Sequence, residues 1–177
     1  MKSTFEFKKI SQTEIDAVLS ILEDAKAELK ETSFQWQNGY PNRASLSSDI
    51  ENGILFGEYE NGALLAFFAM IEEPDEDYFY IEGEGWQIPA TEKKSLIVHR
   101  VAVKKDQYGK GLGKGIFDFA KEYAKKKSLL AIKIDTHEKN IRMKRLLEGQ
   151  GFSHRGTIYI GREKTNKARL AYEYLLK

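Results

Sequence analysis

Gln107-Tyr108-Gly109-Lys110-Gly111-Leu112-Gly113-Lys114-Gly115-Ile116 is the most informative segment of this chain. Its glycines occupy alternate positions, after a β-like run over 96–103 and before an amphipathic run that continues to about residue 127. The order strand, glycine loop, helix presents backbone N–H groups to a phosphate, because glycine lets a ligand approach and a helix N-terminus adds unpaired donors. The segment therefore predicts a phosphate-binding loop. The alternative is a glycine-rich turn before an ordinary surface helix.

The spacing of these glycines excludes two common phosphate motifs. In a P-loop, Gly113-Lys114 would be followed by Ser or Thr, but the next residue is Gly115, and position 108 is Tyr rather than Gly. In the dinucleotide fingerprint G-x-G-x-x-G, the last glycine would fall at position 114 or 116, which are Lys and Ile. The pattern that remains is Tyr108-Gly109-Lys110-Gly111-Leu112-Gly113.

This remaining pattern resembles the pyrophosphate loop of the GNAT N-acetyltransferase superfamily, in which Arg/Gln-x-x-Gly-x-Gly/Ala follows a strand and binds coenzyme A. The Arg/Gln position is Tyr108 here, and Gln107 lies one place earlier. A second motif, Asn140-x-x-Met143-x-x-Leu146-Leu147-Glu148-x-x-Gly151-Phe152, resembles the family's N-x-x-A-x-x-L-Y-E-x-x-G-F helix. Two motifs in the correct order, separated by one strand, are more specific than either alone.

Three shorter segments resemble a bacterial subgroup of the same family. They are Gln-Trp-Gln-x-Gly-Tyr-Pro over 35–41, His99-Arg100, and Asp135-Thr136-His137-Glu138. The resemblance implies the GNAT (acyl-CoA N-acyltransferase) fold, an α/β architecture with a mixed, mostly antiparallel sheet flanked by helices. It also implies one domain over residues 1–177.

Hydrophobic periodicity and turn signals predict an order of elements that matches this fold. Strands are predicted over 4–10, 53–60, 63–72, 96–103, 129–135, 152–160 and 168–176, and helices over 11–29, 43–52, 112–127 and 136–149. Asn61-Gly62 between two apolar runs predicts a hairpin. Runs of strands and helices in this order are typical of a layered α/β domain with a mixed sheet.

Composition limits the classes of function. The chain has 177 residues, 41% of them hydrophobic, and a net charge of +1, which indicates neither a nucleic-acid nor a membrane partner. It has no cysteine, so disulfides, thiol catalysis and cysteine-ligated metals are excluded. With three histidines and no H-E-x-x-H pair we expect no metal. The N-terminus has no apolar signal region, so we expect a cytoplasmic protein.

The resemblance implies acetyl-CoA as the cofactor and acetyl transfer by direct attack of an amine on the thioester. The backbone of Val101 and Val103 would pair with the pantetheine arm, and the Val101 N–H would donate to the oxyanion. Asn140 is carried over as a further contact to that arm, with a plain helix N-cap as the alternative. The pyrophosphate would lie on the loop that starts at Tyr108, on the N–H groups of Gly109, Lys110, Gly111, Leu112 and Gly113.

An alkyl amine has a pKa of ~10.4 and arrives mostly protonated, so a base is needed. His99 is the first candidate, because it lies on the strand that leads to the loop, two residues before Val101. His137 is the second, since it follows the strand 129–135 at its carboxyl end, where α/β folds collect ligands. The alternatives are a satisfied core histidine for His99 and a helix cap for His137.

The general acid of the family, the Tyr of L-Y-E, is absent, because that position is Leu147. A thiol with a pKa of ~8.5 leaves acceptably without a general acid, so activity need not be lost. Tyr80 or Tyr159 are possible substitutes, and the sequence favours neither.

The loop 34–41 and the segment 78–88 are expected to form the acceptor pocket, while the acidic turn 72–77 is predicted to be a solvated loop. The predicted pocket residues are Trp36, Tyr40, Tyr80, Trp86 and Arg100. The alternative is that these aromatics close the core. The sequence thus predicts an N-acetyltransferase for a primary amine of a small molecule or peptide, with a homodimer possible. A non-catalytic acyl-CoA-binding module and an unrelated phosphate-binding α/β domain are the competing readings.

Overall fold

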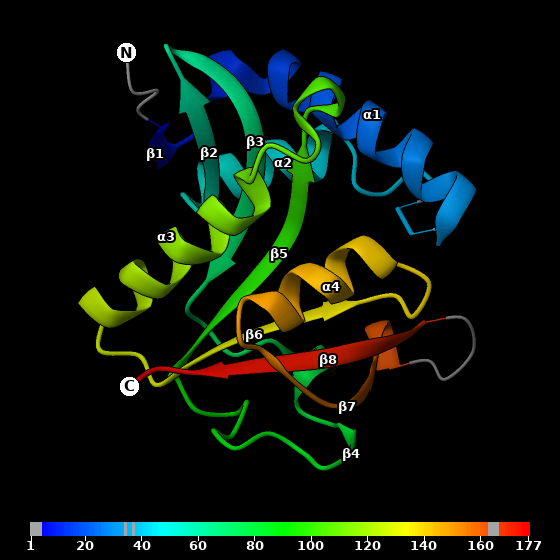
Figure 1. The fold of residues 1–177 in the computed structure, drawn as a ribbon, viewed down its shortest axis with the longest axis vertical. Coiled ribbons are helices and arrows are strands. Elements are labelled where there is room, and N and C mark those ends of the chain that lie inside the picture. Colours follow the sequence, from blue (N-terminus) through cyan, green and yellow to red (C-terminus); the bar gives the residue numbers. More distant parts are fainter. Residues whose placement is uncertain (1–4, 34, 37, 163–166) are drawn as a thin grey trace. The chain divides into compact units, whose positions relative to one another are not determined.

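The structure is a computed structural model that describes residues 5–33, 35–36, 38–162 and 167–177 (Figure 1). These residues form α-helices and a mixed set of strands, as the sequence predicts. The chain divides into two compact units, Met1–Met70 with Arg100–Ile116, and Ile71–His99 with Phe117–Lys177. Thr4 of the first predicted strand, and Phe34 and Gln37 of the predicted acceptor loop, lie outside the described residues.

The first unit is built on an antiparallel set of strands. It contains β1 (Phe5–Lys9), α1 (Ile15–Thr32), α2 (Arg43–Glu51), β2 (Leu55–Glu60) and β3 (Ala63–Ile71) up to its penultimate residue. β2 pairs antiparallel with both β1 and β3. Asn61 and Gly62 have φ angles of 51° and 80°, the positive values that a tight hairpin requires, which confirms the predicted turn.

The core of this unit lies between the two helices and the strands. Val18 and Leu22 of α1 and Leu46 of α2 are fully buried, together with Leu55 of β2 and Phe67 of β3. The buried residues of α1 recur at helical spacing, as expected from the hydrophobic periodicity that predicts a helix over 11–29.

Two elements pass from one unit into the other, β5 (Ser95–Val103) and α3 (Leu112–Lys126). The second unit also contains β4 (Glu82–Gly83), β6 (Ala131–Thr136), α4 (Ile141–Gly149), β7 (Ser153–Tyr159) and β8 (Ala168–Leu175). Its strands lie in the order β5-β6-β8-β7-β4, and Figure 1 shows β8 between β6 and β7. Among the described strands of the second unit, only β5 and β6 pair in parallel, which confirms a mixed, mostly antiparallel arrangement.

The short strand β4 lies in the segment 78–88, where the sequence predicts no strand. Its two residues pair with Thr157 and Gly156 of β7. A Cβ atom on Gly156 would lie only 2.1 Å from the carbonyl oxygen of Glu82, so the two backbones can meet there only because Gly156 has no side chain. A two-residue ladder leaves no alternating pattern, and this is why periodicity could not reveal it.

A buried ion pair connects β6 to β8. The fully buried Lys133 places its Nζ 3.0 Å from Glu173 Oε1 and 2.6 Å from Ser95 Oγ. The Glu173 carboxylate also accepts the backbone N–H groups of Gln87 and Ile88, at 2.8 and 3.2 Å. The pair therefore holds the segment after β4 against β8.

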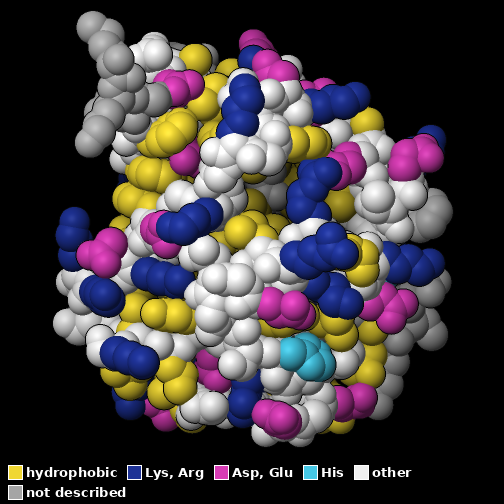
Figure 2. Space-filling view, in the orientation of Figure 1, with side chains coloured by type: hydrophobic (Ala, Val, Ile, Leu, Met, Phe, Trp, Pro, Cys, Tyr) yellow, Lys and Arg dark blue, Asp and Glu magenta, His cyan; other side chains and the backbone are white. Residues whose placement is uncertain are grey.

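The face shown in Figure 2 carries Lys and Arg side chains interspersed with Asp and Glu. Such mixing agrees with the net charge of +1. No helix within the described ranges combines the length and the apolar character needed to cross a membrane.

Candidate functional site

The glycine loop of the first unit is open to an approaching ligand. Gly109 and Gly111 have φ angles of 78° and 87°, and a Cβ atom placed on either would meet nothing within 4 Å. Both positions need the left-handed backbone that glycine adopts easily, and neither is crowded by neighbouring atoms. Space for a ligand therefore adjoins the backbone at these two glycines.

The N–H groups of this loop differ in their partners. Those of Tyr108, Lys110 and Gly115 donate to backbone carbonyls of the loop and the turn before it. Within the described part of the chain, no acceptor forms a hydrogen bond with the N–H groups of Gly109, Gly111, Leu112 and Gly113. The loop ends in the N-terminus of α3, whose dipole favours negative charge. This combination suits a phosphate or pyrophosphate group.

The end of β5 presents further backbone donors at one edge. The N–H of Lys104 donates to the carbonyl of Leu65 on β3 at 2.8 Å. Because successive N–H groups of a strand point to alternate edges, those of Val101 and Val103 point away from β3. The ladder between β5 and β6 covers only Ser95–Ile97 on β5, so it does not use these two groups.

A buried carboxyl lies beneath the first turn of α3. Glu58 of β2 is 1% exposed, and its Oε2 has no hydrogen-bond partner among the described residues. A Cβ atom on Gly115 would lie 2.7 Å from Glu58 Oε1, which explains why position 115 is a glycine. Burial raises the pKa of Glu58 to about 8, so the carboxyl is neutral at pH 7.

Arg100 has an unusual backbone and a fixed side chain. Its φ of 54° lies in the left-handed region, which is costly for a residue other than glycine. Its Nη1 lies 2.8 Å from Asp49 Oδ2, and its Nη2 donates to the hydroxyl of Tyr40. The guanidinium carbon lies 5.5 Å from the centre of the Tyr40 ring. Two predicted pocket residues are thus in contact, and the sequence did not reveal Asp49 as their partner.

The other three predicted pocket aromatics have different surroundings. Trp36 packs against the core of the first unit. Trp86 stacks on Tyr78 with ring centres 5.6 Å apart and donates its Nε1–H to the Tyr78 carbonyl at 2.8 Å. Tyr80 is 60% exposed and donates to Glu82 at 3.1 Å. The two indoles therefore contribute to packing, and the Tyr80 ring is accessible.

His99, in the second unit, lies between two carboxylates. Its Nε2 is 3.3 Å from Asp75 Oδ2, and its Nδ1 is 3.9 Å from Asp135 Oδ1. The same Asp135 oxygen accepts the Tyr78 hydroxyl at 2.7 Å. The histidine and both aspartate side chains are between 11 and 29% exposed, so solvent reaches the cluster. No group of His, Asp or Glu side chains in the described ranges is arranged to hold a metal ion.

The acidic turn 72–77 has half-buried or exposed side chains, as expected for a solvated loop, but two of its carboxylates also have specific partners. Asp75 bonds to His99, and its Oδ1 accepts the N–H of Asp77 at 3.0 Å. Glu72 accepts the hydroxyl of Tyr123 at 2.6 Å. The run of acidic residues suggested solvation, but individual carboxylates have specific donors in the second unit.

His137 and Asn140 make capping contacts near the start of α4. His137 Nδ1 accepts the N–H of Lys139 at 3.1 Å, and Asn140 Oδ1 accepts the N–H of Met143 at 3.2 Å. Burial, and next the charge of Arg169, lower the pKa of His137, which favours the neutral ring. A contact between Asn140 and the pantetheine arm stays a prediction.

The position of the missing tyrosine belongs to the core. Leu147 is fully buried, so it provides packing rather than acid chemistry. The two proposed substitutes share one acceptor, since Tyr80 and Tyr159 both donate to the Glu82 carboxylate, at 3.1 and 2.8 Å. The structure therefore pairs these tyrosines without distinguishing between them.

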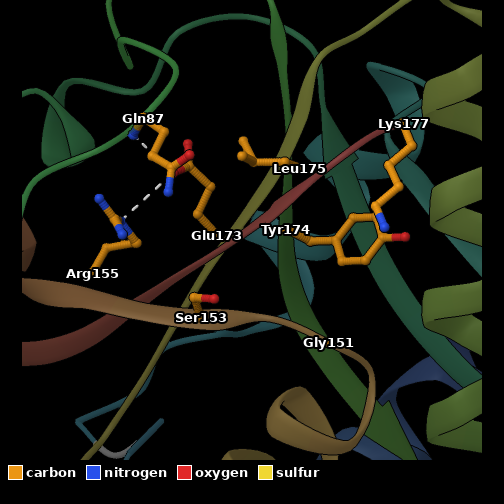
Figure 3. A pocket seen from close by; sticks show the side chains of 8 residues that line it. All are labelled: Gln87, Gly151, Ser153, Arg155, Glu173, Tyr174, Leu175 and Lys177. Atoms are coloured by element: carbon orange, nitrogen blue, oxygen red, sulfur yellow. Dashed lines mark hydrogen bonds and ion pairs between the residues drawn. The ribbon is translucent and has the colours of Figure 1, made fainter.

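A cavity of about 330 Å³ opens in the second unit beside β7 and β8 (Figure 3). It is lined by Gln87, Gly151, Ser153, Arg155, Glu173, Tyr174, Leu175 and Lys177. Figure 3 shows Gln87 and Arg155 directed at Glu173, whose carboxylate already bonds to Lys133. None of the lining residues was predicted to belong to the site.

The sequence model of the Acetyltransferase (GNAT) family matches residues 15–152. Among curated proteins, none matches the chain. A GNAT-family acetyltransferase from Streptococcus agalactiae 2603 is similar in structure, with 30% identity, a TM-score of 0.87, and 98% of this chain and 96% of the other covered. A GNAT-family acetyltransferase from Listeria monocytogenes 4b F2365 has 21% identity, a TM-score of 0.75 and 99% of each chain covered. The ribosomal-protein-S18-alanine N-acetyltransferase from Escherichia coli has 13% identity, a TM-score of 0.65, and 98% and 95% covered.

Proposed function

Because the chain belongs to the GNAT acetyltransferase family, we propose that it transfers the acetyl group of acetyl-CoA to a primary amine of a small molecule or peptide. The open glycine loop is the observation that supports this proposal most strongly. We also infer that residues 1–177 act as one domain, since the family match extends across both units. A cytoplasmic location, which the sequence leads us to expect, is part of the proposal, with a homodimer possible.

The first unit offers backbone donors for the pyrophosphate and for the pantetheine arm of the cofactor. The N–H groups of Gly109, Gly111, Leu112 and Gly113 lack other acceptors in the described chain and would hold the pyrophosphate. The edge N–H groups of Val101 and Val103 would pair with the extended arm as a further strand would. Acetyl-CoA, when bound, supplies the acetyl group as a thioester.

We assign the role of general base to His99, with His137 as the second candidate. An amine with a pKa of ~10.4 must lose a proton before it can attack, and a partly exposed imidazole can take it. The N–H of Val101, two residues further along β5, would donate to the acetyl carbonyl oxygen. One donor of this kind is typically worth ~3 kcal/mol in the transition state.

Arg100 and Tyr40 are the strongest candidates for acceptor contacts in the first unit. Tyr40 is 49% exposed, so its ring is available, and the Arg100 guanidinium lies 5.5 Å from the centre of that ring. Tyr80 offers an exposed ring in the second unit. Trp36 and Trp86 would act as supporting walls, consistent with their packing.

Calorimetry with acetyl-CoA tests the cofactor part of the proposal. We expect wild-type binding near micromolar Kd, or about −8 kcal/mol. Gly111→Ala should weaken binding by about tenfold or more, because a Cβ atom would enter the space beside the loop and the left-handed backbone would be strained. Gly62→Ala is the matched control, since Gly62 also has a positive φ and open space but lies in the β2–β3 hairpin.

Wild-type protein that does not bind acetyl-CoA would contradict the proposal. Release of free thiol is then measured over a panel of primary amines. Binding without thiol release from any amine would indicate the non-catalytic acyl-CoA-binding module instead.

A further inference from the structure

Both ring nitrogens of His99 face a carboxylate, and this arrangement restricts how the ring can carry its proton. Asp75 Oδ2 is within hydrogen-bond reach of Nε2, at 3.3 Å. Asp135 Oδ1 is 3.9 Å from Nδ1, which is too long for a hydrogen bond. An ionised carboxylate can only accept, so the neutral ring donates Nε2–H to Asp75 and leaves the lone pair on Nδ1.

Tyr78 fixes the second carboxylate. Its side chain is fully buried, its ring meets the His99 ring nearly edge-on at 5.6 Å, and its hydroxyl donates to Asp135 Oδ1 at 2.7 Å. Burial, and next the Asp135 charge, keep the pKa of Tyr78 well above its ordinary value, so the hydroxyl remains a donor. Trp86 also stacks on the Tyr78 ring and donates its Nε1–H to the Tyr78 carbonyl.

We propose that Asp75, Asp135 and Tyr78 are positioning residues that set the orientation and the basicity of His99. The proposal rests on the proposed function, in which His99 is the general base. Asp75 fixes the ring with Nδ1 available, and Asp135 stabilises the imidazolium once Nδ1 is protonated. Tyr78 holds Asp135 in place. Because its hydroxyl donates to Asp135 Oδ1, the oxygen nearest His99, it also limits how strongly Asp135 stabilises the positive charge of the imidazolium.

The proton step balances without any further reactant. An N–H bond of the acceptor ammonium breaks, its electron pair stays on the amine nitrogen, and an Nδ1–H bond forms on His99. The imidazolium later releases this proton to solvent. With His99 neutral, the two aspartates carry two negative charges, so the cluster attracts a cationic amine before this step.

Other charged groups also face the cluster. Asp77, on the same turn as Tyr78, acts on the Tyr78 hydroxyl, and its Oδ1 accepts the N–H of Gly161 at 2.9 Å. Arg169 of β8 interacts electrostatically with Asp135. These groups stay unchanged in the variants below, so their contributions are constant across the series.

The test uses Asp75→Asn, Asp135→Asn and Tyr78→Phe in the full chain, with kcat/KM recorded against pH. Each asparagine keeps the size of the side chain but removes a charge that favours the protonated ring. We therefore expect about a tenfold loss of kcat/KM, and an acid limb moved to lower pH. Tyr78→Phe frees Asp135 to act more strongly on the ring, so its acid limb should move the opposite way, to higher pH.

Tyr123→Phe is the matched control, because it removes a tyrosine hydroxyl that donates to a different carboxylate, Glu72. It should leave the profile unchanged. Thermal unfolding of every variant separates a fold defect from a change in the base. The proposal is overturned if both asparagine variants keep the wild-type acid limb, or if Tyr78→Phe moves it in the same direction as Asp135→Asn.

A second readout does not depend on turnover. The chain has three histidines, so NMR signals of the His99 ring can be assigned with His137→Gln and His154→Gln. Relative to wild type, the His99 ring should titrate at lower pH in both asparagine variants and at higher pH in Tyr78→Phe. If wild type acetylates no amine, the proposed function fails. The ring titrations would still decide whether these three residues control the protonation of His99.

Discussion

A single buried carboxyl, Glu58, couples the stability of the first unit to pH. Its pKa is raised from 4.5 to about 8 by burial, so the folded state keeps a proton that the unfolded chain releases above pH 4.5. The free energy of unfolding is therefore highest in acid, as far as Glu58 contributes to it, and falls as the pH rises from about 4.5 to about 8.

Glu58→Gln removes this dependence, because an amide does not titrate in that range. Relative to wild type, we expect the variant to gain stability steadily between pH 5 and pH 8, by as much as ~4 kcal/mol at the upper end. Urea unfolding of both proteins at several pH values measures the difference. Parallel pH profiles for the two proteins would show that Glu58 is not protonated in the folded state.

At this scale the sequence revealed backbone roles better than side-chain roles. The glycines at 109 and 111 could be predicted to expose the main chain, because only glycine combines a positive φ with an open approach. The partners of His99 could not be predicted, since Asp75 and Asp135 are distant from it in sequence and belong to segments with no shared pattern. The sequence does not explain why position 115 is a glycine, and the structure does, because Glu58 Oε1 leaves no room there for a Cβ atom.

At the level of elements, β4 depends on the close approach of two glycine-containing strands. Gly156→Ala would place a Cβ atom 2.1 Å from the Glu82 carbonyl oxygen, at a φ of 144° that side chains rarely adopt. We expect a loss of ~3 kcal/mol in the free energy of unfolding, with the pairing between β4 and β7 disrupted. Hydrogen exchange of the Gly85 N–H, which donates to Arg155 at 3.1 Å, reports on the disruption.

Gly149→Ala serves as the control for this prediction. Gly149 closes α4 and a Cβ atom there would meet nothing within 4 Å, so the exchange should be neutral or slightly stabilising. Equal stabilities of the two alanine variants would contradict the proposed crowding at position 156.

The ion pair between β6 and β8 gives a second prediction for the elements. Lys133→Met removes the nearer cation from the buried Glu173, whose other cationic neighbour, Arg155 Nε, is 3.8 Å away, and should cost ~3–5 kcal/mol. Lys133→Met combined with Glu173→Gln should recover part of this loss, because no unpaired charge remains. A double-mutant cycle in urea measures the coupling, and additive losses would show that the two side chains act independently.

Most elements could be predicted because their burial imposes a period on the sequence. The helix predicted over 11–29 and the Asn61-Gly62 hairpin are examples, and both were confirmed. The ladder between β5 and β6 ends at Ile97, and nothing in the β-like run 96–103 indicates where pairing stops. Periodicity identifies a strand but carries no information on how many of its residues are paired.

For the whole molecule, the family could be identified from two motifs in the right order, and the comparisons confirm it. The same evidence does not extend to the acceptor, because a fold supports many functions through side chains outside the shared motifs. Arg100, Tyr40 and Tyr80, which we propose as acceptor contacts, lie outside the two motifs that identify the family.

Amide NMR during a titration with acetyl-CoA tests the central claim most directly, namely that bare main-chain amides of the first unit bind the cofactor. We expect one set of amide signals to shift together and to saturate at one Kd. These are the signals of Val101, Val103, Gly109, Gly111, Leu112 and Gly113. Unchanged signals at these positions would contradict it, as would shifts confined to the cavity around Tyr174.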